Sequence, residues 1–335
     1  MENIEQKRSL EEVFNSTFHS KLPFSALTEL TIDSEFKHKI FNNRDIYLPT
    51  DKLKKIHRFV NGSILEYAEI NRNVVFSYRK GVSIRDAVEK HTCNKFFFQT
   101  DIKNFYGSIS KKNISDIFDH RFDMVPISDL DNYRKKLLDL MVINDQLPAG
   151  FSTSPMLSNI CLFDFDNELE QYCNESHLTY TRYSDDIIIS SSEKENLTDL
   201  SEFIQSLLYK HVNKETLIND NKTKIVKHGS NVKILGFSIL PNGELTISSK
   251  DKKEIEILLH FFLNDAEKFN NYIESKLSFK HDDSSDRNAY DSALSSLCGR
   301  IVALNSMDKK YLDKLRRKYG NTLIEMFLRK TVLKN

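Results

Sequence analysis

Short runs of β-branched and aromatic residues alternate with longer helical repeats over residues 96 to about 247. The first run, Lys95–Asp101, is largely apolar and ends at an acidic residue. Two further runs, Thr179–Tyr183 and Ile187–Ile189, flank the polar tip Ser184–Asp186. All three runs predict strands, and the last two predict a hairpin that carries two adjacent carboxylates at its tip.

Apolar residues with helical spacing fill the stretches between and after these strands. Ser110 and Ser128 precede two such stretches and are candidate N-caps. The buried faces of these helices would carry Ile114, Ile117, Phe118 and Phe122, and Leu130, Tyr133, Leu137, Leu138 and Met141. From Ser249 onward the spacing is helical, with an interruption at the polar stretch His281–Asn288. Strands packed on helices, followed by a helical tail, predict an α+β fold.

The acidic residues at the strand ends are candidates for a metal site. Asp185 and Asp186 repel each other and lose hydration at an apolar tip unless a cation lies between them. A strand that brings Asp101 beside this tip completes a set of three carboxylates. Such a set can hold two Mg²⁺ ions about 3.5–4 Å apart, the arrangement used for in-line nucleotidyl transfer. Taken alone, the hairpin tip is more typical of a solvated turn, and Asp101 could equally be a strand-end cap.

Five segments lie in order along the chain: Phe98–Tyr106, Leu147–Asn159, Tyr183–Asp186, Asn221–Lys224 and Ile234–Ile239. They resemble motifs A to E of reverse transcriptases, and Tyr78–Ile84 is similar to the fingers segment of bacterial members. The resemblance implies a right-hand polymerase with an antiparallel palm sheet packed on helices. Its regions would be fingers over 1–95, a palm over 96–247 with inserted finger helices at about 110–145, and a helical thumb over 248–335.

The resemblance also assigns roles to the acidic cluster. Asp101 and Asp185 would bridge two Mg²⁺ ions, for which Mn²⁺ could substitute, and Asp186 would tune the second ion site. The backbone carbonyl of Ile102 would be an additional ligand. Lys222 fits the motif D lysine that protonates the leaving pyrophosphate, with a plain surface lysine as the alternative.

Tyr106, five residues after Asp101, matches the steric gate of the family. An aromatic ring there blocks a ribose 2′-hydroxyl and selects deoxynucleotides, whereas an ordinary core aromatic is the alternative. Arg79 and Lys80 are candidates for contacts with the triphosphate or the template backbone, although each could be a surface residue.

Motifs B and E supply the remaining candidates. Gly150 and Pro155 would shape a turn whose backbone meets the incoming base pair, and Gly236 and Phe237 would support the primer end. Ala149 departs from the family, since many reverse transcriptases have Gln there. Its small side chain is expected to weaken one contact with the incoming nucleotide.

The balance of charge adds one further candidate surface. The 335 residues include 48 Lys and Arg and 48 Asp and Glu, so that the formal net charge is zero. A zero net charge is unexpected for an enzyme of nucleic acids, but it averages over local patches. Residues 309–335 hold nine basic residues against Asp313 and Glu325, with aromatic residues between them. This basic stretch predicts contacts with a nucleic-acid backbone, with a solvated helix face as the alternative.

Four scattered cysteines form no CxxC pair, which argues against zinc or a disulfide framework. No apolar run approaches the roughly 18 residues of a membrane span, and the first residues have no apolar signal core. These features predict a cytoplasmic protein with no membrane partner, and the resemblance implies that it is bacterial.

We therefore predict a compact bacterial reverse transcriptase that uses dNTPs to copy a dedicated non-coding RNA into DNA in antiphage defence. An effector protein or a homo-oligomer is a further possible partner. The first alternative is a retron enzyme that makes RNA-linked DNA. It ranks second because Asp86–His91 only partly resembles the retron Asn-Ala-x-x-His element and the thumb lacks Val-Thr-Gly. Two further hypotheses are template-independent or protein-primed DNA synthesis of abortive-infection type and a non-catalytic RNA-binding scaffold.

Overall fold

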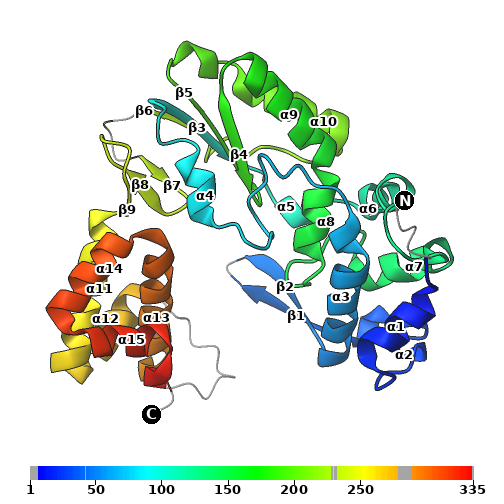
Figure 1. Ribbon diagram of the computed structural model, residues 1–335, viewed down its shortest axis with the longest axis horizontal. Helices are drawn as coiled ribbons and strands as arrows, with labels where there is room; N and C mark the ends of the chain where they lie inside the picture. Colours follow the sequence, from blue (N-terminus) through cyan, green and yellow to red (C-terminus); the bar gives the residue numbers. More distant parts are fainter. Residues whose placement is uncertain (1–6, 42, 228, 230–231, 278–288, 334–335) are drawn as a thin grey trace, which may run out of the picture. The chain divides into compact units, whose positions relative to one another are not determined.

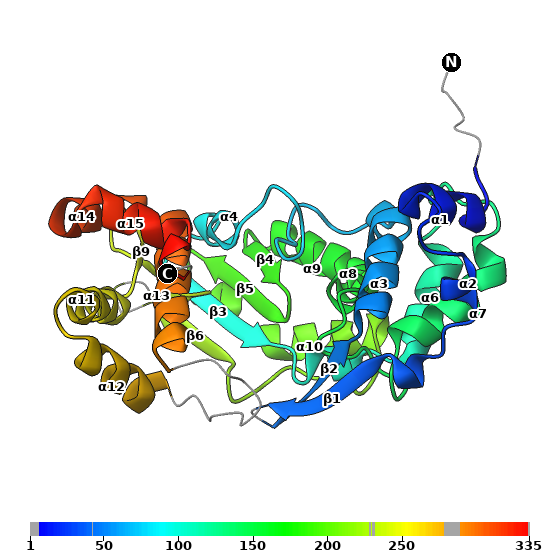
Figure 2. The same ribbon diagram turned by 90° about the horizontal axis from the view of Figure 1, so that it is seen from below.

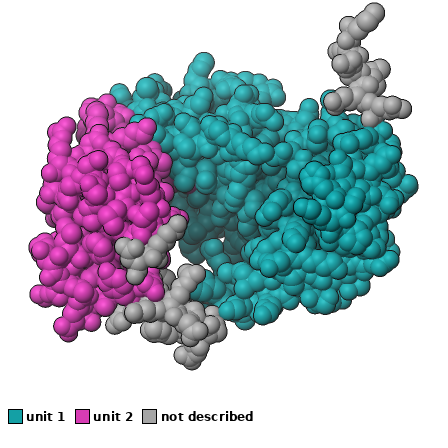
Figure 3. All heavy atoms as spheres, turned by 60° about the horizontal axis from the view of Figure 1, so that its bottom comes forward, with its two compact units in different colours: residues 1–226 teal, residues 227–335 magenta. Residues whose placement is uncertain are grey.

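The computed structural model describes residues 7–41, 43–227, 229, 232–277 and 289–333. The chain divides into two compact units, unit 1 (residues 1–226) and unit 2 (residues 227–335), which have separate colours in Figure 3. The predicted helix interruption at His281–Asn288 lies outside the described residues. Within the described ranges, every helix is too short or too polar to cross a membrane.

Unit 1 contains the strand that ends at Asp101 and the hairpin that carries Asp185 and Asp186. Its helices and strands are labelled in Figure 1. Its helices are α1 (Leu10–Phe18), α2 (Ser25–Thr28), α3 (Asp51–Ser63), α4 (Ile84–Glu89), α5 (Phe105–Ser108), α6 (Lys111–His120), α7 (Leu130–Met141), α8 (Ser154–Cys161), α9 (Phe163–Glu175) and α10 (Leu200–His211). Its strands are β1 (Phe36–Phe41), β2 (Arg44–Pro49), β3 (Phe96–Asp101), β4 (Thr179–Tyr183), β5 (Asp186–Ser191) and β6 (Lys224–Lys227), which reaches the unit boundary. Short 3₁₀ helices lie at Ile32–Ser34, Leu65–Tyr67 and Glu195–Leu197.

Four strands form the central sheet of unit 1 in the order β4-β5-β3-β6. Strands β4 and β5 form an antiparallel hairpin in which Tyr183 pairs with Asp186, and Ser184 and Asp185 make the turn between them. Ser184 has a φ of +60°, so that it adopts the left-handed backbone conformation. Strand β3 pairs antiparallel with β5 and places Asp101 opposite Asp186. The predicted strands and the predicted hairpin are confirmed.

Different elements cover the two faces of this sheet. Because side chains alternate along a strand, Tyr180 and Arg182 of β4 reach Asp166 on α9, whereas Thr181 between them reaches His91, just beyond α4. Helix α9 packs on β4 and α10 packs on α9, and the two helices lie side by side in Figures 1 and 2. Helices α9 and α10 therefore cover one face, and the segment that follows α4 lies on the other.

The start of α6 confirms one predicted helix cap, and the start of α7 corrects another. Ser110 caps α6, since its hydroxyl accepts the backbone N–H of Asn113 and the Asn113 side chain bonds back. Ser128 does not cap α7, because the N-cap is Asp129. The Asp129 side chain makes no cap bond either, since its Oδ1 accepts the backbone N–H of Leu10 at 2.6 Å. A distant part of the chain thus takes the carboxylate that could have capped the helix.

His91 links the segment after α4 to the sheet from a fully buried position. Its Nδ1 lies 2.7 Å from Ser190 Oγ, and its Nε2 lies 2.7 Å from Thr181 Oγ1. Burial lowers the pKa of His91 to about 3. The imidazole therefore stays neutral in the native protein at every pH at which the fold is expected to persist.

We expect the free energy of unfolding to fall as the pH drops below about 6.5, the ordinary pKa of histidine. Below this pH the unfolded chain protonates His91, whereas the native protein does not do so until about pH 3. The loss attributable to His91 amounts to about 1.4 kcal/mol per pH unit in this window. Urea unfolding at pH 7.5 and pH 5.5 should therefore show a smaller pH effect in His91→Gln than in the wild type. The variant His120→Gln, at an exposed residue, should behave like the wild type. Equal pH effects in His91→Gln and the wild type would refute this account of the buried ring.

Unit 2 combines a small sheet with a helical array. Strands β7 (Lys233–Ile234), β8 (Phe237–Ile239) and β9 (Leu245–Ile247) are antiparallel in that order. They precede α11 (Ser249–Asn264), α12 (Ala266–Leu277), α13 (Ala289–Met307), α14 (Lys309–Tyr319) and α15 (Asn321–Leu328), with a final 3₁₀ helix at Thr331–Leu333. The predicted helical spacing after Ser249 is confirmed. The division into fingers, palm and thumb is finer than these two units and stays a prediction.

Much of the basic stretch at residues 309–335 is neutralised within unit 2. Its ion pairs include Lys310 with Glu244, Arg316 with Asp313 and Glu325, Lys318 with Glu256, and Arg329 with Glu325. Two of these acids, Glu244 and Glu256, come from outside the stretch. Its predicted contact with a nucleic-acid backbone therefore rests on fewer free charges than the sequence suggested.

Candidate active site

Strand register brings two of the three predicted carboxylates together. Asp101 ends β3, Asp186 begins β5, and the two residues are cross-strand partners. Such partners point to the same face of a sheet, with Cβ atoms about 4.5–5.5 Å apart. The backbone N–H of Ile102 donates to the carbonyl of Asp185 at 3.1 Å, so that the end of β3 is bonded to the turn. This bond fixes the backbone of Asp185, which carries the third carboxylate and directly precedes Asp186.

The charges of this cluster are only partly balanced. Asp101 is buried, and its Oδ2 accepts a hydrogen bond from Lys222 Nζ, whereas its Oδ1 is buried without a hydrogen-bond partner. Burial, followed by repulsion from Asp185 and Asp101, raises the pKa of Asp186 to about 6, and Lys222 opposes this shift. An unpartnered carboxylate oxygen among like charges is the kind of donor that a divalent cation satisfies. The residues therefore fit a metal site.

The three predicted carboxylates are nevertheless not all gathered around one position in the described part of the chain. Among the residues that the structure describes, no set of three or more His, Cys, Asp or Glu side chains is grouped tightly enough to hold a metal ion. Like charges repel, and the cation that contacts Asp101 is the Lys222 ammonium. The register pair and the adjacent turn are thus the structural basis for the site.

Strand β6 accounts for the position of Lys222. It lies beside β3 in the sheet, and the hydroxyls of Thr223 and Thr100 are 2.7 Å apart across this pairing. The hydrogen bond with Asp101 raises the pKa of Lys222, while partial burial opposes the rise. Lys222 is consequently a protonated side chain at the carboxylates, as motif D predicts, although it is more than half exposed.

A cavity of about 320 Å³ opens at this position. It is lined by Gln99, Thr100, Asp101, Asp186, Asn221, Lys222, Thr223 and Lys224. A larger hollow of about 590 Å³ lies along α10 and residues 217–221, but it contains none of the three carboxylates. The smaller cavity is the one that has the chemistry of the site.

Tyr106 reaches the same region from α5. It is half-buried, and its hydroxyl lies 2.8 Å from the hydroxyl of Tyr78, which in turn lies 2.9 Å from Ser184 Oγ. Burial and then the hydrogen bond with Tyr78 raise the pKa of Tyr106 well above the usual tyrosine value. The candidate gate is therefore a neutral phenol tied to the turn that carries Asp185.

The motif B turn is fixed against β2. The carbonyl of Ala149 accepts the backbone N–H of Tyr47 at 2.8 Å. Gly150 has a φ of +107°, and a Cβ added there would lie 2.3 Å from the carbonyl oxygen of Tyr47. Pro155 lies in the first turn of α8. A backbone N–H at this position would have no partner within the helix, so proline costs no hydrogen bond there. The need for glycine at 150 thus follows from the close approach of β2, and the nucleotide contacts of this turn stay predictions.

Arg79 and Lys80 point to different partners. The Arg79 guanidinium donates to the carbonyls of Arg72, at 2.7 Å, and Val75, so that it stabilises its own segment. Lys80 pairs with Glu66 at 2.5 Å, and its side chain is 90% exposed. Of the two, Lys80 has the side chain that is more available to an anionic ligand.

The predicted primer-end residues belong to unit 2. Phe237 begins β8 and is buried there, and Gly236 precedes it with a φ of +88°. Because the Phe237 side chain is buried, a contact with a primer would come from the backbone of this turn. That role stays a prediction.

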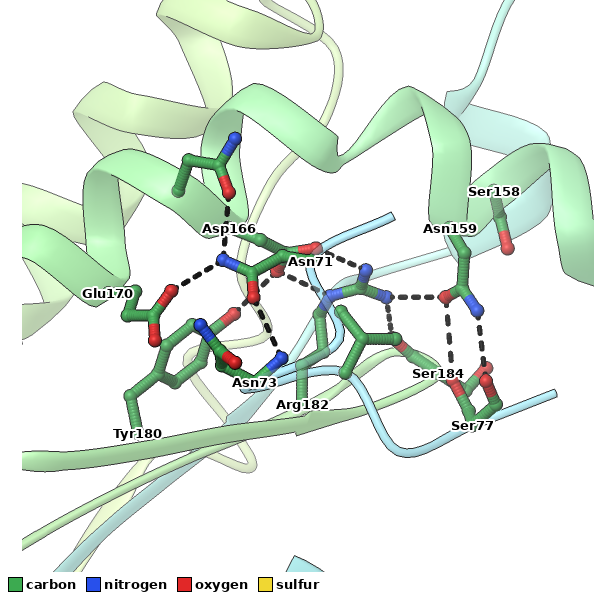
Figure 4. Close-up of polar contacts among 12 residues, drawn as sticks. Asn71, Asn73, Ser77, Ser158, Asn159, Asp166, Glu170, Tyr180, Arg182 and Ser184 are labelled. Carbon is green, nitrogen blue, oxygen red and sulfur yellow. Dashed lines mark hydrogen bonds and ion pairs between the residues drawn. The ribbon is translucent and has the colours of Figure 1, made fainter. Parts of the chain in front are cut away.

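A buried polar network behind the hairpin turn was missed from the sequence (Figure 4). The fully buried Arg182 donates to both carboxylate oxygens of Asp166, at 2.8 and 2.5 Å, and to Asn159 Oδ1 at 3.0 Å. Its Nη1 also donates to the carbonyl of Ser184 at 2.9 Å, and Tyr180 donates to Asp166 at 2.7 Å. An arginine inside a short strand of Thr and Tyr residues was the available signal, since a buried arginine requires a buried partner.

The network also holds the segment that precedes Tyr78. The backbone N–H of Arg182 donates to the carbonyl of Val74 at 2.7 Å, and that of Phe76 donates to the carbonyl of Arg182 at 3.0 Å. Asn159 Nδ2 donates to the carbonyl of Ser77 at 3.0 Å. Burial alone would lower the pKa of Arg182, but the Asp166 carboxylate more than offsets this and raises it. The guanidinium thus stays charged and ties motif B, the motif C turn and residues 74–77 together.

Comparison with known proteins agrees with this geometry. The family model described as reverse transcriptase (RNA-dependent DNA polymerase) matches residues 37–239, which is more than half of the chain. The retron Ec83 reverse transcriptase of Escherichia coli is 23% identical over 290 residues, covering 84% of each chain. The retron Ec73 enzyme of the same species is 27% identical over 289 residues, covering 82% of this chain and 83% of the relative. The retron Ec86 enzyme is 22% identical over 314 residues, covering 90% and 88%.

Among solved structures, telomerase from Candida albicans aligns with 91% of this chain and 70% of its own, at 12% identity and a TM-score of 0.45. So distant a likeness adds nothing to the assignment, which rests on the family model and the relatives. Reverse transcriptases copy an RNA template into DNA and depend on divalent metal ions. The chain, an α+β protein, belongs to the reverse transcriptase family and is an RNA-directed DNA polymerase similar to the retron enzymes of bacteria.

Proposed function

We propose that this protein copies a non-coding RNA into DNA in the manner of a retron enzyme, at a site built on Asp101, Asp185 and Asp186. The observation that carries the proposal is the cross-strand pairing of Asp101 with Asp186, beside the turn residue Asp185, in a chain of the reverse transcriptase family. The three carboxylates, with the carbonyl of Ile102, would hold two Mg²⁺ ions, for which Mn²⁺ could substitute. When bound, such ions activate the primer 3′-hydroxyl and neutralise charge on the triphosphate.

The residues around the carboxylates have separate tasks in this proposal. The Lys222 ammonium lies at Asp101 and donates a proton to the leaving pyrophosphate. The Tyr106 ring excludes the ribose 2′-hydroxyl. Lys80 contacts the triphosphate or the template backbone from its exposed position, whereas Arg79 acts by fixing the segment.

The incoming base pair and the primer end are assigned to backbone turns. The motif B turn of Ala149, Gly150 and Pro155 would meet the nascent pair, and the turn at Gly236 and Phe237 would support the primer. Ala149 has no amide to offer to the nucleotide, so that a weaker contact is expected there than in enzymes with Gln.

The retron assignment extends to partners and setting. Three relatives that are retron reverse transcriptases align with more than 80% of both chains, which supports a dedicated RNA template and an RNA-linked DNA product. We place the enzyme in the bacterial cytoplasm, in antiphage defence, with an effector protein or a second copy of the chain as a further partner. The template, the trigger and the effector are to be found at the native locus.

The experiment is to purify the protein with the RNA expressed from its native locus, add Mg²⁺ and labelled dNTPs, and sequence both nucleic acids. We expect DNA that is complementary to one co-purified RNA, and ribonuclease treatment should shift the mobility of a DNA product that is linked to RNA. Homopolymeric or random DNA made after removal of the RNA would instead indicate untemplated synthesis. Bound RNA without any incorporation would indicate a scaffold.

The gate makes a separate prediction. In Tyr106→Val the ring is lost, and we expect the preference for a dNTP over the matching rNTP, as a ratio of kcat/KM values, to fall about ten- to a hundred-fold, the effect of one steric contact in a pocket. Tyr106→Phe retains the ring and should lower the preference only about five-fold, the effect of one lost hydrogen bond. Single-nucleotide incorporation on one RNA template and DNA primer measures both ratios. An unchanged ratio in Tyr106→Val would remove Tyr106 from this role.

A further inference from the structure

Three hydroxyl groups from distant segments meet beside the catalytic turn. The Tyr78 hydroxyl lies between the hydroxyl of Tyr106, at 2.8 Å, and Ser184 Oγ, at 2.9 Å. Tyr106 comes from α5, Ser184 from the β4–β5 turn, and Tyr78 from the segment before α4. One phenol can donate to one neighbour and accept from the other, so that both contacts can form together. Neither the metal site nor the proton transfer uses Tyr78.

The backbone of Tyr78 is held in an unfavourable conformation by its neighbours. Its φ is +58°, in the left-handed region that bulky side chains rarely adopt. On one side Ser77 is buried, and its carbonyl accepts Asn159 Nδ2 at 3.0 Å. On the other side the Arg79 guanidinium donates to the carbonyl of Arg72 at 2.7 Å. These contacts direct the Tyr78 ring toward the site, although 41% of the residue remains exposed.

The opposite anchor is equally fixed. The carbonyl of Ser184 accepts Arg182 Nη1 at 2.9 Å, and Arg182 is itself held by Asp166 at full burial. Figure 4 shows Arg182 reaching Ser184 and Asn159, with Ser77 beyond Asn159. The Tyr106 ring packs against the core of unit 1 and against the Phe105 ring. Its phenol oxygen is held by the Tyr78 hydroxyl at 2.8 Å and also interacts with Ser184. The bond with Tyr78 therefore ties the polar end of the gate ring to the segment before α4.

We propose that Tyr78 is a positioning residue that sets sugar selectivity by holding the Tyr106 ring against the Ser184 turn. The inference rests on the proposed role of Tyr106 as the gate. Without the Tyr78 hydroxyl, the Tyr106 phenol turns more freely about its side-chain torsions and leaves room for a ribose 2′-hydroxyl. Tyr78 thus acts through Tyr106 and not through contact with the nucleotide. A single hydrogen bond between neutral groups corresponds to about a five-fold change in a rate ratio.

The test is a double-mutant cycle on Tyr78→Phe and Tyr106→Phe, with kcat/KM measured for one dNTP and its matching rNTP. Tyr78→Phe should lower the dNTP preference about five-fold, and Tyr106→Phe should do the same. The double variant should be no less selective than Tyr106→Phe alone, because that substitution already removes the bond that Tyr78→Phe breaks. Tyr67→Phe, at a residue that is 44% exposed, is the matched control and should keep the wild-type ratio.

Three results would overturn the inference. The dNTP preference could be unchanged in Tyr78→Phe, or the two effects could multiply in the double variant. Parallel loss of both kcat/KM values at a constant ratio would indicate a purely structural role for Tyr78. Tyr106→Val separates this inference from the role of Tyr106 as the gate. If the dNTP preference falls in Tyr106→Val but stays at the wild-type value in Tyr78→Phe, only the role of Tyr78 is refuted. Unchanged selectivity in Tyr106→Val refutes both.

Discussion

Asp185→Asn is expected to abolish DNA synthesis while the protein folds as the wild type does. Asn has the shape of Asp but lacks the charge that a divalent cation requires, and the metal site supplies several kcal/mol of transition-state stabilisation. A loss of that size corresponds to about a thousand-fold or more in rate. Folding should not suffer, since the substitution removes one of three like charges that crowd the end of β3 and the adjacent turn. Incorporation of a labelled dNTP measures the rate, and urea unfolding measures the stability.

Asp33→Asn makes the same chemical change at an exposed residue of the first 3₁₀ helix. It should synthesise DNA at the wild-type rate, so that any loss in Asp185→Asn can be ascribed to the site. Synthesis by Asp185→Asn within about ten-fold of the wild type would show that this carboxylate does not hold a catalytic ion. Loss of synthesis together with a large fall in stability would also count against the account, which requires an intact fold.

Arg182→Met is expected to lower the free energy of unfolding by about 3–5 kcal/mol, the usual effect of breaking a buried ion pair on one side. Asp166 would remain fully buried without its partner, and the carbonyl of Ser184 would lose its donor. Because this network also holds the motif C turn, DNA synthesis should fall as well. Urea unfolding followed by circular dichroism measures the first effect, and dNTP incorporation measures the second.

Two comparisons define the cause. Arg85→Met breaks a solvent-accessible pair with Glu89 along α4 and should cost only about 0.3–0.5 kcal/mol. Adding Asp166→Leu to Arg182→Met removes the unpaired charge and should restore more than half of the lost stability. A fall of less than about 1 kcal/mol in Arg182→Met would mean that the buried network is not the support described here.

The parts of this fold that local pattern determines were predictable. Runs of β-branched and aromatic residues predicted β3 and the β4–β5 hairpin, and the acids at their ends were expected to meet, as the pairing of Asp101 with Asp186 shows. The cap of α6 was predictable because Ser110 and its partner Asn113 are only three residues apart. Lys222 was assigned to the site by family resemblance, and its contact with Asp101 became visible only in the structure.

Contacts between distant segments could not be read from the sequence. Ser128 was the wrong cap for α7, and the Asp129 carboxylate binds the backbone of Leu10, 119 residues away. The trio of Tyr78, Tyr106 and Ser184 requires three segments to meet, and no local pattern encodes that meeting. The charge of the basic stretch was overestimated for the same reason, since its opposing acids include residues far from it in sequence.

The order of the functional hypotheses changed for a related reason. The retron hypothesis ranked below general antiphage defence because Asp86–His91 matched the retron element only in part. In the structure the buried His91 ring forms hydrogen bonds with Ser190 and Thr181, so that it has a structural role within the fold. The relatives, aligned along most of the chain, support the retron type where the short element alone could not.

The most direct test of templated synthesis at the Asp101–Asp186 site is primer extension on a defined RNA template with one dNTP left out. The account predicts extension that stops one nucleotide before the first template base that pairs with the omitted dNTP, and no extension by Asp185→Asn. Products that run past that base, or that form equally well without the RNA, would contradict it.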